Sequence, residues 1–272
     1  VENISCFFYG CSSLKNINVD HFVTSETRSI GNLFSGCSSL ESLDLSHWNT
    51  SSVISMNSLF SDCTKLETID LSSFETYNAT SMGGLFGGCK NLKSITYGDG
   101  FNTEKASDLS FMFSECSSLE VIDLSKYSTS KAITFHNMFS GCSSLKKIIW
   151  GDKFDTHYAE DFGGMFGGCS SLENLDLSWF NMSSSRNING MFAGCTNLKK
   201  LNISSFTSEH IENNMIESLF MGCNNLAELR MGSQFNPTNF FQAFGGVASK
   251  IDGKCNIYCS ETFINNFSKD SY

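Results

Sequence analysis

The sequence predicts an α/β repeat solenoid of nine coils, with a parallel sheet on one face and short helices on the other. Three observations predict it: a cysteine that returns at a regular spacing, an apolar pattern of period two after each cysteine, and a pattern of helical period before it. The repeating cysteines are Cys11, Cys37, Cys63, Cys89, Cys116, Cys142, Cys169, Cys195 and Cys223.

The spacing of these cysteines indicates the type of coil. It runs from 26 residues, as between Cys11 and Cys37, to 28 residues between Cys195 and Cys223. This lies within the period of leucine-rich repeats, which wind into a right-handed coil. One such unit cannot bury its own apolar face, so we expect neighbouring coils to stack and form one continuous core.

A short strand is predicted after each cysteine. In the second repeat Leu43 and Leu45 alternate with small or charged residues, which is typical of a strand with one buried face. Stacked strands of this kind form a parallel sheet with a spacing of about 4.8 Å. In three repeats a bulky residue and a glycine replace the usual end of the strand, which predicts a bulge. These are Tyr97-Gly98, Trp150-Gly151 and Met231-Gly232.

A two-turn helix is predicted before each cysteine. In the segment 56–63 the apolar residues and the cysteine stand at i, i+3, i+4 and i+7, which is the stripe of an amphipathic helix. The phenylalanine of this stripe recurs in the next coils, so we expect Phe139 to lie between Phe113 and Phe166 in a column. Glycine precedes the cysteine in seven of the nine repeats, as a helix-ending residue would; the exceptions are Asp62 and Glu115.

Composition excludes several classes of function. The formal charge is −10 and the basic residues form no cluster, which argues against a nucleic-acid partner. No apolar run approaches the length of about 18 residues that a membrane-spanning helix needs. The chain opens on Val1, already inside the repeat pattern, so we expect any secretion signal or anchor to lie outside this sequence.

Two stretches carry a resemblance to a known family. "LFSGCSSLESLDLSHWNTSSVISM" (33–56) and "MFSGCSSLKKI" (138–148) resemble the BspA-type leucine-rich repeats of bacterial surface proteins. They are most similar to the 26-residue variety found in Mycoplasma, Listeria and other Firmicutes. The tail 255–272 is similar to the family's usual ending, a short strand followed by a capping helix. The resemblance therefore implies a solenoid over 1–245 and a C-terminal cap over 246–272.

The resemblance also implies a surface-exposed, often adhesive protein, with no catalytic residue to carry over. Ordinary leucine-rich repeats place Asn or Cys three residues after the last strand leucine, where this sequence usually has an aromatic residue such as Trp48 or Phe74. We therefore expect stacked rings in place of an internal asparagine ladder.

The repeating cysteines are interpreted as buried free thiols that act as small apolar residues. Neighbouring coils would bring their Cα atoms to about 5 Å, a distance that a disulfide tolerates, but parallel stacking disfavours its torsion. Zinc is disfavoured because no histidine recurs in register with them. A disulfide between Cys255 and Cys259 on the terminal strand stays open.

No other pattern predicts catalysis, a metal or a cofactor. The chain contains none of the common nucleophile, zinc-hydrolase or phosphate-loop motifs. The glycine-rich segments 83–88 and 163–168 occupy core positions of the repeat, which favours backbone crowding over phosphate binding. An outward row of Asp residues on the strands, including Asp44 and Asp70, is too sparse for calcium and reads as a solvated face.

One break in the repeat predicts a binding surface. Val121 and Ile149 take outward strand positions that are mostly small or charged elsewhere, and Trp150 lies beside them. The candidate site consists of Val121, Ile149 and Trp150, rimmed by Asp123, Lys147 and Asp176. The alternative is that the tail, a neighbouring domain or a partner subunit covers these residues.

The predicted function is therefore a non-enzymatic extracellular module, at the cell surface or secreted, that binds a host or matrix protein or glycan in adhesion. The alternative is a passive stalk that presents another domain. A binder is distinguished from a stalk by a non-repeating apolar patch.

Overall fold

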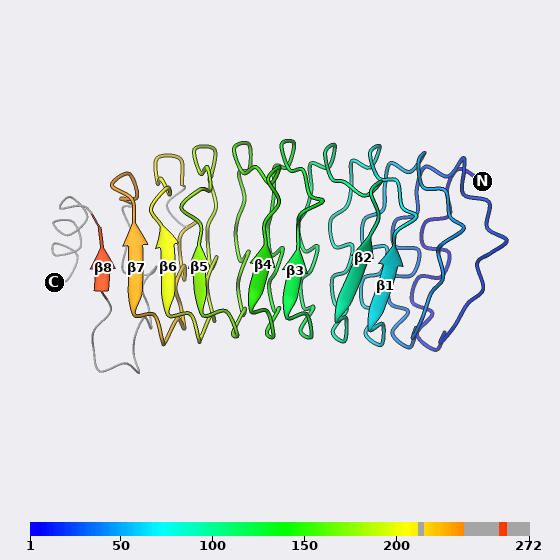
Figure 1. Cartoon of the computed structure of the whole chain (residues 1–272), viewed down its shortest axis with the longest axis horizontal. Helices are drawn as coiled ribbons and strands as arrows, with labels where there is room; N and C mark the ends of the chain where they lie inside the picture. The colour runs from blue at the N-terminus through cyan, green and yellow to red at the C-terminus, as the bar shows by residue number, and fades with distance from the viewer. Residues whose placement is uncertain (212–214, 237–255, 260–272) are drawn as a thin grey trace.

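The computed structural model describes residues 1–211, 215–236 and 256–259, and these wind into a solenoid of stacked coils. Figure 1 shows the strands side by side along one face, with the N-terminus at one end of the stack and β8 at the other. The strands are β1 (Thr68–Leu71), β2 (Ser94–Tyr97), β3 (Val121–Asp123), β4 (Lys147–Ile149), β5 (Asn174–Asp176), β6 (Lys200–Ile203), β7 (Glu228–Met231) and β8 (Asn256–Tyr258). Strands β1 to β7 begin five residues after a repeating cysteine, as the alternation of Leu43 and Leu45 predicts, although the first two coils carry no assigned strand.

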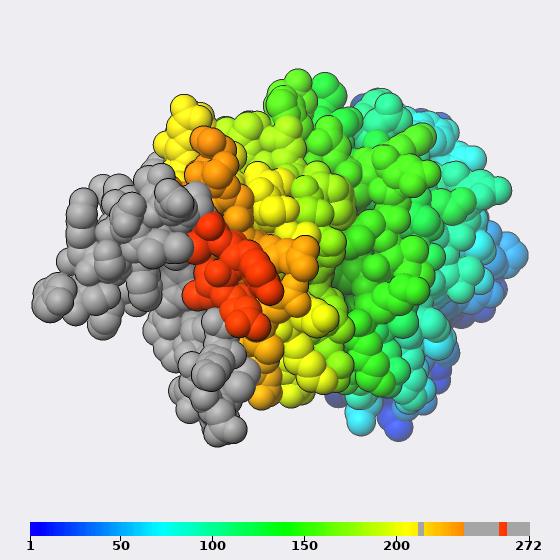
Figure 2. All heavy atoms as spheres, turned by 60° about the vertical axis from the view of Figure 1, so that its left-hand side comes forward, coloured from blue at the N-terminus to red at the C-terminus, as the bar shows by residue number. Residues whose placement is uncertain are grey.

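All strand pairs are parallel, but within the described residues they form three sheets rather than one. The orders are β1-β2, β3-β4 and β5-β6-β7-β8, so the ladder is interrupted between β2 and β3 and between β4 and β5. In Figure 2, β8 lies against β7 at the C-terminal end of this face.

Three ion pairs of one kind lie within these strand pairs, while the pair of Asp99 with Lys126 crosses the break between the β2 and β3 coils. A glutamate stands one residue before each of the strands β1, β3 and β5. It binds the lysine at the corresponding position of the next coil. The pairs are Glu67–Lys93 at 2.8 Å, Glu120–Lys146 at 2.9 Å and Glu173–Lys199 at 2.9 Å. Their side chains are largely exposed, so each pair contributes little stability.

The predicted helices are absent from the described residues, and consecutive turns take their place. The amide of Leu33 donates to the carbonyl of Ile30 and that of Cys37 to Phe34, each closing a four-residue turn. The third residue of these turns has positive φ, as in type II turns: Asn32 at 55° and Gly36 at 76°. Positive φ recurs five residues and one residue before every repeating cysteine, so no helix can continue through the segment.

Alternate amides of these turn segments bond across coils instead of along a helix. The amide of Phe34 donates to the carbonyl of Leu59 at 3.0 Å, and that of Phe86 to Met112 at 2.9 Å. The turn segments therefore form a second face of the solenoid, which we call the turn face, with its own hydrogen-bond ladder. The apolar spacing that predicts a helix is satisfied by two successive turns.

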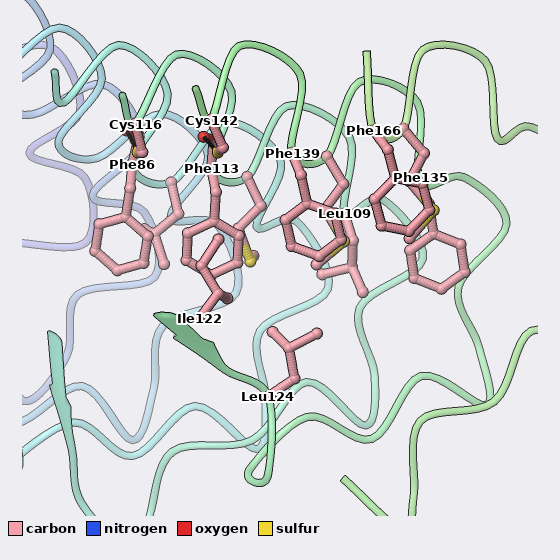
Figure 3. Close-up of a cluster of buried hydrophobic side chains, with 14 of the residues drawn as sticks. Phe86, Leu109, Phe113, Cys116, Ile122, Leu124, Phe135, Phe139, Cys142 and Phe166 are labelled. Carbon is pink, nitrogen blue, oxygen red and sulfur yellow. Dashed lines mark hydrogen bonds between the residues drawn. The ribbon is translucent and has the colours of Figure 1, made fainter. Parts of the chain in front are cut away.

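The core between the two faces is organised around a column of phenylalanines (Figure 3). The ring centroid of Phe139 lies 5.9 Å from that of Phe113 and 5.5 Å from that of Phe166, which confirms the predicted column. Ile122 and Leu124 of the strand side face these rings. Within the described residues the column runs from Phe8 to Phe220.

The repeating cysteines are buried free thiols from Cys37 to Cys223, as predicted, whereas Cys11 is exposed. Each buried thiol also makes a hydrogen bond that the sequence did not indicate. Cys142 Sγ donates to the carbonyl oxygen of Phe113, and Cys89 Sγ to that of Phe60, both at 3.0 Å.

A ladder of threonines, rather than stacked rings, occupies the inner corner after the strands. Thr50 Oγ1 donates to the carbonyl of Glu75 at 3.1 Å and accepts the amide of Glu75 at 2.8 Å. The same pattern recurs in later coils at Thr76, Thr129 and Thr156. The aromatic residues before the threonines stack only in places, as Phe22 does on Trp48. Threonine thus carries the inter-coil bonds at this corner.

The bulge glycines mark close contacts between coils. A Cβ on Gly98 would lie 1.9 Å from the carbonyl oxygen of Ser72, and one on Gly151 would lie 2.6 Å from that of Leu124. These coils press against the coil before them, and the sheet breaks on their other side, after β2 and after β4. Gly232 makes the same close approach to Ser204, but β7 continues to β8, so a break follows two of the three predicted bulges.

The described part of the chain contains no helix with the length and apolar character needed to cross a membrane. The predicted cap over 246–272 lies outside the described residues except for 256–259, which include β8. Cys255 is also outside them, so the alternative of a disulfide with Cys259 is not tested.

Candidate binding surface on the sheet

The pairing of β3 with β4 brings four of the six candidate residues together. Val121 lies opposite Lys147 and Asp123 opposite Ile149, so the two apolar side chains sit diagonally across the pair, within reach of one ligand. Val121 is 46% exposed and Ile149 is 38% exposed. The centre of the predicted surface is therefore present and open to solvent.

Trp150 takes a different place from the one predicted. It is half-buried, and its ring packs against Phe154 at 4.9 Å and Phe180 at 5.5 Å between centroids. The ring of Trp179 lies 5.3 Å from that of Trp150 between centroids, and Trp179 is 44% exposed. Trp150 supports the surface from its edge, and Trp179 is the more exposed ring.

Trp179 is a residue that the sequence analysis missed. Other repeats place a small or polar residue at its position, such as His47 or Ser73. A large apolar residue at an outward position of the repeat was the signal that could have identified it. The two tryptophans lie at the break between β4 and β5 and fill it from one end.

Asp123 and Asp176 have structural partners as well as exposure. Asp123 Oδ1 accepts the amide of Ser125 at 2.8 Å, and Asp176 Oδ1 accepts that of Ser178 at 2.9 Å. The latter bond lowers the pKa of Asp176. The row of strand aspartates therefore ends the strands with Asx turns, and Asp176 lies across the break, on β5 rather than beside Ile149.

A slot opens beside the candidate surface, at the break between β2 and β3. Its volume is about 220 Å³, and it reaches the ring of Phe113 in the core. Ile95, Tyr97 and Val121 form its apolar sides, and Asp123 stands at its rim. Tyr97 is held by a hydrogen bond between its hydroxyl and that of Tyr127, at 2.9 Å. The slot extends the exposed apolar surface of Val121 inward.

The neighbouring strands β5 to β7 carry a charged hollow of about 440 Å³. Outward side chains of both signs line it, including Lys200, Glu228 and Arg230. Arg230 Nε donates to Glu228 Oε1 at 2.8 Å, so these charges are largely paired with one another. The sheet face thus changes from apolar at β3-β4 to charged at β5-β7.

The described residues contain no cluster of metal-binding side chains, and their buried thiols are protected. No three His, Cys, Asp or Glu side chains among them are placed to hold one metal ion. Burial raises the pKa of the core thiols, to about 12 for Cys89 and Cys223, which keeps them protonated and unreactive at neutral pH. The surface offers apolar contact, hydrogen bonds and charge.

Comparison with known proteins gives a family and a set of folds. The family described as "Mycoplasma protein of unknown function, DUF285" matches residues 2–121 and 107–231. No curated protein sequence matches this chain.

Among solved structures, a leucine-rich repeat protein of T. pallidum is 18% identical, with a TM-score of 0.38, over 84% of this chain and 81% of that one. The pneumococcal vaccine antigen PcpA is 17% identical, with a TM-score of 0.49, over 91% and 64%. A leucine-rich repeat protein of Eubacterium ventriosum is 14% identical, with a TM-score of 0.42, over 95% and 78%.

Proposed function

The chain belongs to the family described as "Mycoplasma protein of unknown function, DUF285". We propose that it is a non-enzymatic extracellular module that binds a host or matrix macromolecule in adhesion. The family match confirms the resemblance of segments 33–56 and 138–148 to the 26-residue repeats of Mycoplasma. Surface exposure and adhesion are what that resemblance implies, and they enter here as part of the proposal.

One observation carries the binding role: Val121 and Ile149 expose apolar side chains at outward positions of β1 to β7, where every other outward strand residue is small, polar or charged. In β1 the equivalent outward residues are Thr68 and Asp70, both exposed. Strand propensity gives exposed Val and Ile at these positions at most about 1 kcal/mol in folding, whereas a partner that covers them gains about 25 cal/mol for each Å² of apolar surface buried. The adjoining slot provides room for a group of the partner.

The finer organisation is part of the same proposal. We assign nine repeats to residues 1–245 and a cap to 246–272. The phenylalanine column from Phe8 to Phe220 supports the repeat count, because each coil contributes one ring. Strand β8, which continues the last sheet, supports a cap that adds to the solenoid rather than a separate domain.

The test is the double variant Val121→Ser with Ile149→Ser, assayed on a panel of immobilised extracellular-matrix proteins and on a glycan array. We expect the wild type to bind at least one component and the variant to bind it at least tenfold more weakly, with an unchanged Tm. The matched control is Ile54→Ser with Ile133→Ser, because these isoleucines are 39% and 50% exposed outside the strands.

Two results would contradict the proposal. Undiminished binding by the Val121/Ile149 variant would place the site elsewhere on the molecule. Wild-type protein that binds nothing on either panel would favour a passive stalk, whose regular core holds another domain at a distance.

A further inference from the structure

The turn face carries a groove that the sheet surface does not explain. It lies over the glycine-rich segment 83–88, between the turn segments 57–62 and 108–115 of the two neighbouring coils, and its volume is about 560 Å³. Because the phenylalanine column separates the turn face from the strands, a ligand in this groove would not touch Val121 or Ile149. We call it the turn-face groove.

The groove exists because its floor lacks side chains while its walls have them. The four glycines of 83–88 are buried under neighbours from both sides. Ser58 Oγ would lie 2.9 Å from a Cβ on Gly84, and Asp108 Oδ2 would lie 3.0 Å from one on Gly83. The wall side chains therefore reach over the floor. Because the glycines have no side chains, the space between the walls stays open.

The walls are acidic and contain an exposed ring. Asp62 stands on one side and Asp108 and Glu115 on the other, and none of the three joins an ion pair among the described residues. Phe111 is 44% exposed at the rim, with His136 against its ring at 5.4 Å between centroids. The groove thus combines uncompensated negative charge with an accessible aromatic surface.

Three of these wall residues replace the usual residue of the repeat at positions where the usual residue would be more stable. Asp62 and Glu115 have φ of 58° and 59°, and the other repeats place glycine there. Phe111 has φ of 56°, where the corresponding residues are Gly, Asn, Ser or Cys. A left-handed conformation is unfavourable for Glu and Phe. All three exceptions surround the same groove.

The second glycine-rich segment provides an internal comparison. Segment 163–168 also lies on the turn face, but the residues that correspond to Asp62 and Glu115 in its neighbouring coils are Gly141 and Gly194. Asn137 Oδ1 reaches over Gly164, and the carboxylate beside this floor is that of Asp161, which belongs to the same coil and lies next to His136. The two neighbouring coils supply no carboxylate at the positions of Asp62 and Glu115. Glycine-rich floors therefore occur without the acidic walls, so the walls are not a requirement of the fold.

We propose that the turn-face groove binds a cationic peptide segment that carries arginine or lysine. Carboxylates on both walls complement several positive charges along an extended peptide. The exposed face of Phe111 suits an arginine side chain through cation–π contact. The backbone of the floor is already bonded, as Gly84 donates to the carbonyl of Ser110 at 2.7 Å, so recognition falls to the wall side chains rather than to strand addition.

The test restores the repeat's own residues. Asp62→Gly, Glu115→Gly and Phe111→Asn are combined in one variant, and binding of a short fluorescein-labelled peptide of alternating arginine and serine is measured by anisotropy. We expect the variant to bind at least tenfold more weakly while its Tm stays equal or rises. Wild-type binding should weaken as salt increases, because exposed charges are screened.

A charge-matched control separates this groove from the overall acidity of the chain. The control replaces Glu26 and Glu104, both exposed and outside the groove, with glutamine. It removes the same two negative charges as the groove variant and should keep wild-type affinity. Equal loss in the control, no peptide binding by the wild type, or a Tm that falls in the groove variant would each overturn the proposal. Binding of a neutral oligosaccharide in place of the peptide would assign the groove to glycans and overturn the peptide assignment.

Discussion

Cys142 Sγ lies 3.0 Å from the carbonyl oxygen of Phe113, which belongs to the preceding coil. The same oxygen accepts the amide of Cys116 at 3.0 Å, so it has two donors from two coils. The recurring cysteine is therefore both a small apolar residue and a cross-coil hydrogen-bond donor. Alanine would fill a similar place in the repeat without the second donor, which explains why a thiol suits this position.

Thiol labelling should divide the cysteines into two groups. In the native protein we expect rapid labelling of the exposed Cys6 and Cys11 and slow labelling of the buried thiols from Cys37 to Cys223. Burial protects these sulfurs and raises their pKa, which removes the reactive thiolate. Mass spectrometry after a short pulse of iodoacetamide reports each site, and rapid modification of Cys89 or Cys142 would contradict the assignment.

Stability should fall at alkaline pH. The folded-state pKa of a buried thiol such as Cys89 is raised from 9.0 to about 12, so its contribution is complete below the unfolded-state value and is lost as pH rises towards the folded one. For each such thiol, the free energy of unfolding falls by about 1.4 kcal/mol for each pH unit in that window. Urea unfolding under reducing conditions between pH 8 and pH 11 measures the slope.

The control for this effect is the double variant Cys89→Ala with Cys142→Ala. Its stability should depend less steeply on pH, because two buried thiols no longer ionise on unfolding. An identical slope would assign the alkaline loss to other groups, such as the half-buried Tyr97 and the buried Tyr127, whose pKa values desolvation also raises.

Phe139→Ala should destabilise the protein by about 3–5 kcal/mol, as deletion of a buried phenylalanine commonly does. The ring is fully buried and stacks between Phe113 and Phe166. Hydrogen exchange should show the first loss of protection in the adjoining coils, since coils contact only their neighbours. A cost below about 1 kcal/mol would show that the column contributes little to stability.

Thr129→Val tests the threonine ladder with little change in shape. The hydroxyl donates to the carbonyl of Asp155 and accepts its amide, both at 2.6 Å. Removing it should cost about 1–3 kcal/mol, because both backbone groups lose their partner in a part-buried corner. Thr129→Ser keeps the hydroxyl and should recover most of this loss in thermal unfolding; equal destabilisation by both variants would assign the effect to packing of the methyl group.

Gly98→Ala tests the close approach at the bulge. The added Cβ would lie 1.9 Å from the carbonyl oxygen of Ser72, so the coil must move, at a cost of about 1–3 kcal/mol or more. Gly10→Ala is the control for glycine replacement alone, since no atom lies within 4 Å of its Cβ position, although its φ of 71° adds some strain. Equal effects on Tm would mean that contact with Ser72 is unimportant.

The sequence was sufficient to predict the coil period, the position of the strands and the phenylalanine column, because each depends on apolar residues at fixed spacing. It was not sufficient to distinguish a helix from two turns in segments such as 56–63. The stripe is the same for both, and the difference lies in the positive φ of Ser58 and Asp62, whose residue types do not demand it. The threonine ladder was visible as a Thr two residues after Trp48 and Phe74, but its role depends on hydrogen bonds between coils.

The candidate surface could be predicted only in part. Val121, Asp123, Lys147 and Ile149 follow from alternation along two strands, which fixes their direction. Trp150 could not be placed in the same way, because the bulge at Gly151 ends the alternation and turns the ring towards Phe154. The break that separates Asp176 from Ile149 arises from the spacing between coils. The residue pattern within one repeat carries no information about that spacing.

The pairing of coils has a consequence for how such a protein can change in length over evolution. Glu67, Glu120 and Glu173 are spaced by 53 residues, and each binds a lysine of the following coil. Duplication or loss of a two-coil unit by recombination keeps every glutamate beside a lysine. Loss of one coil, such as the one that carries Lys93, would place Glu67 next to Glu120. A change of two coils therefore keeps this alternation of charge within the third to eighth coils, whereas a change of one coil interrupts it.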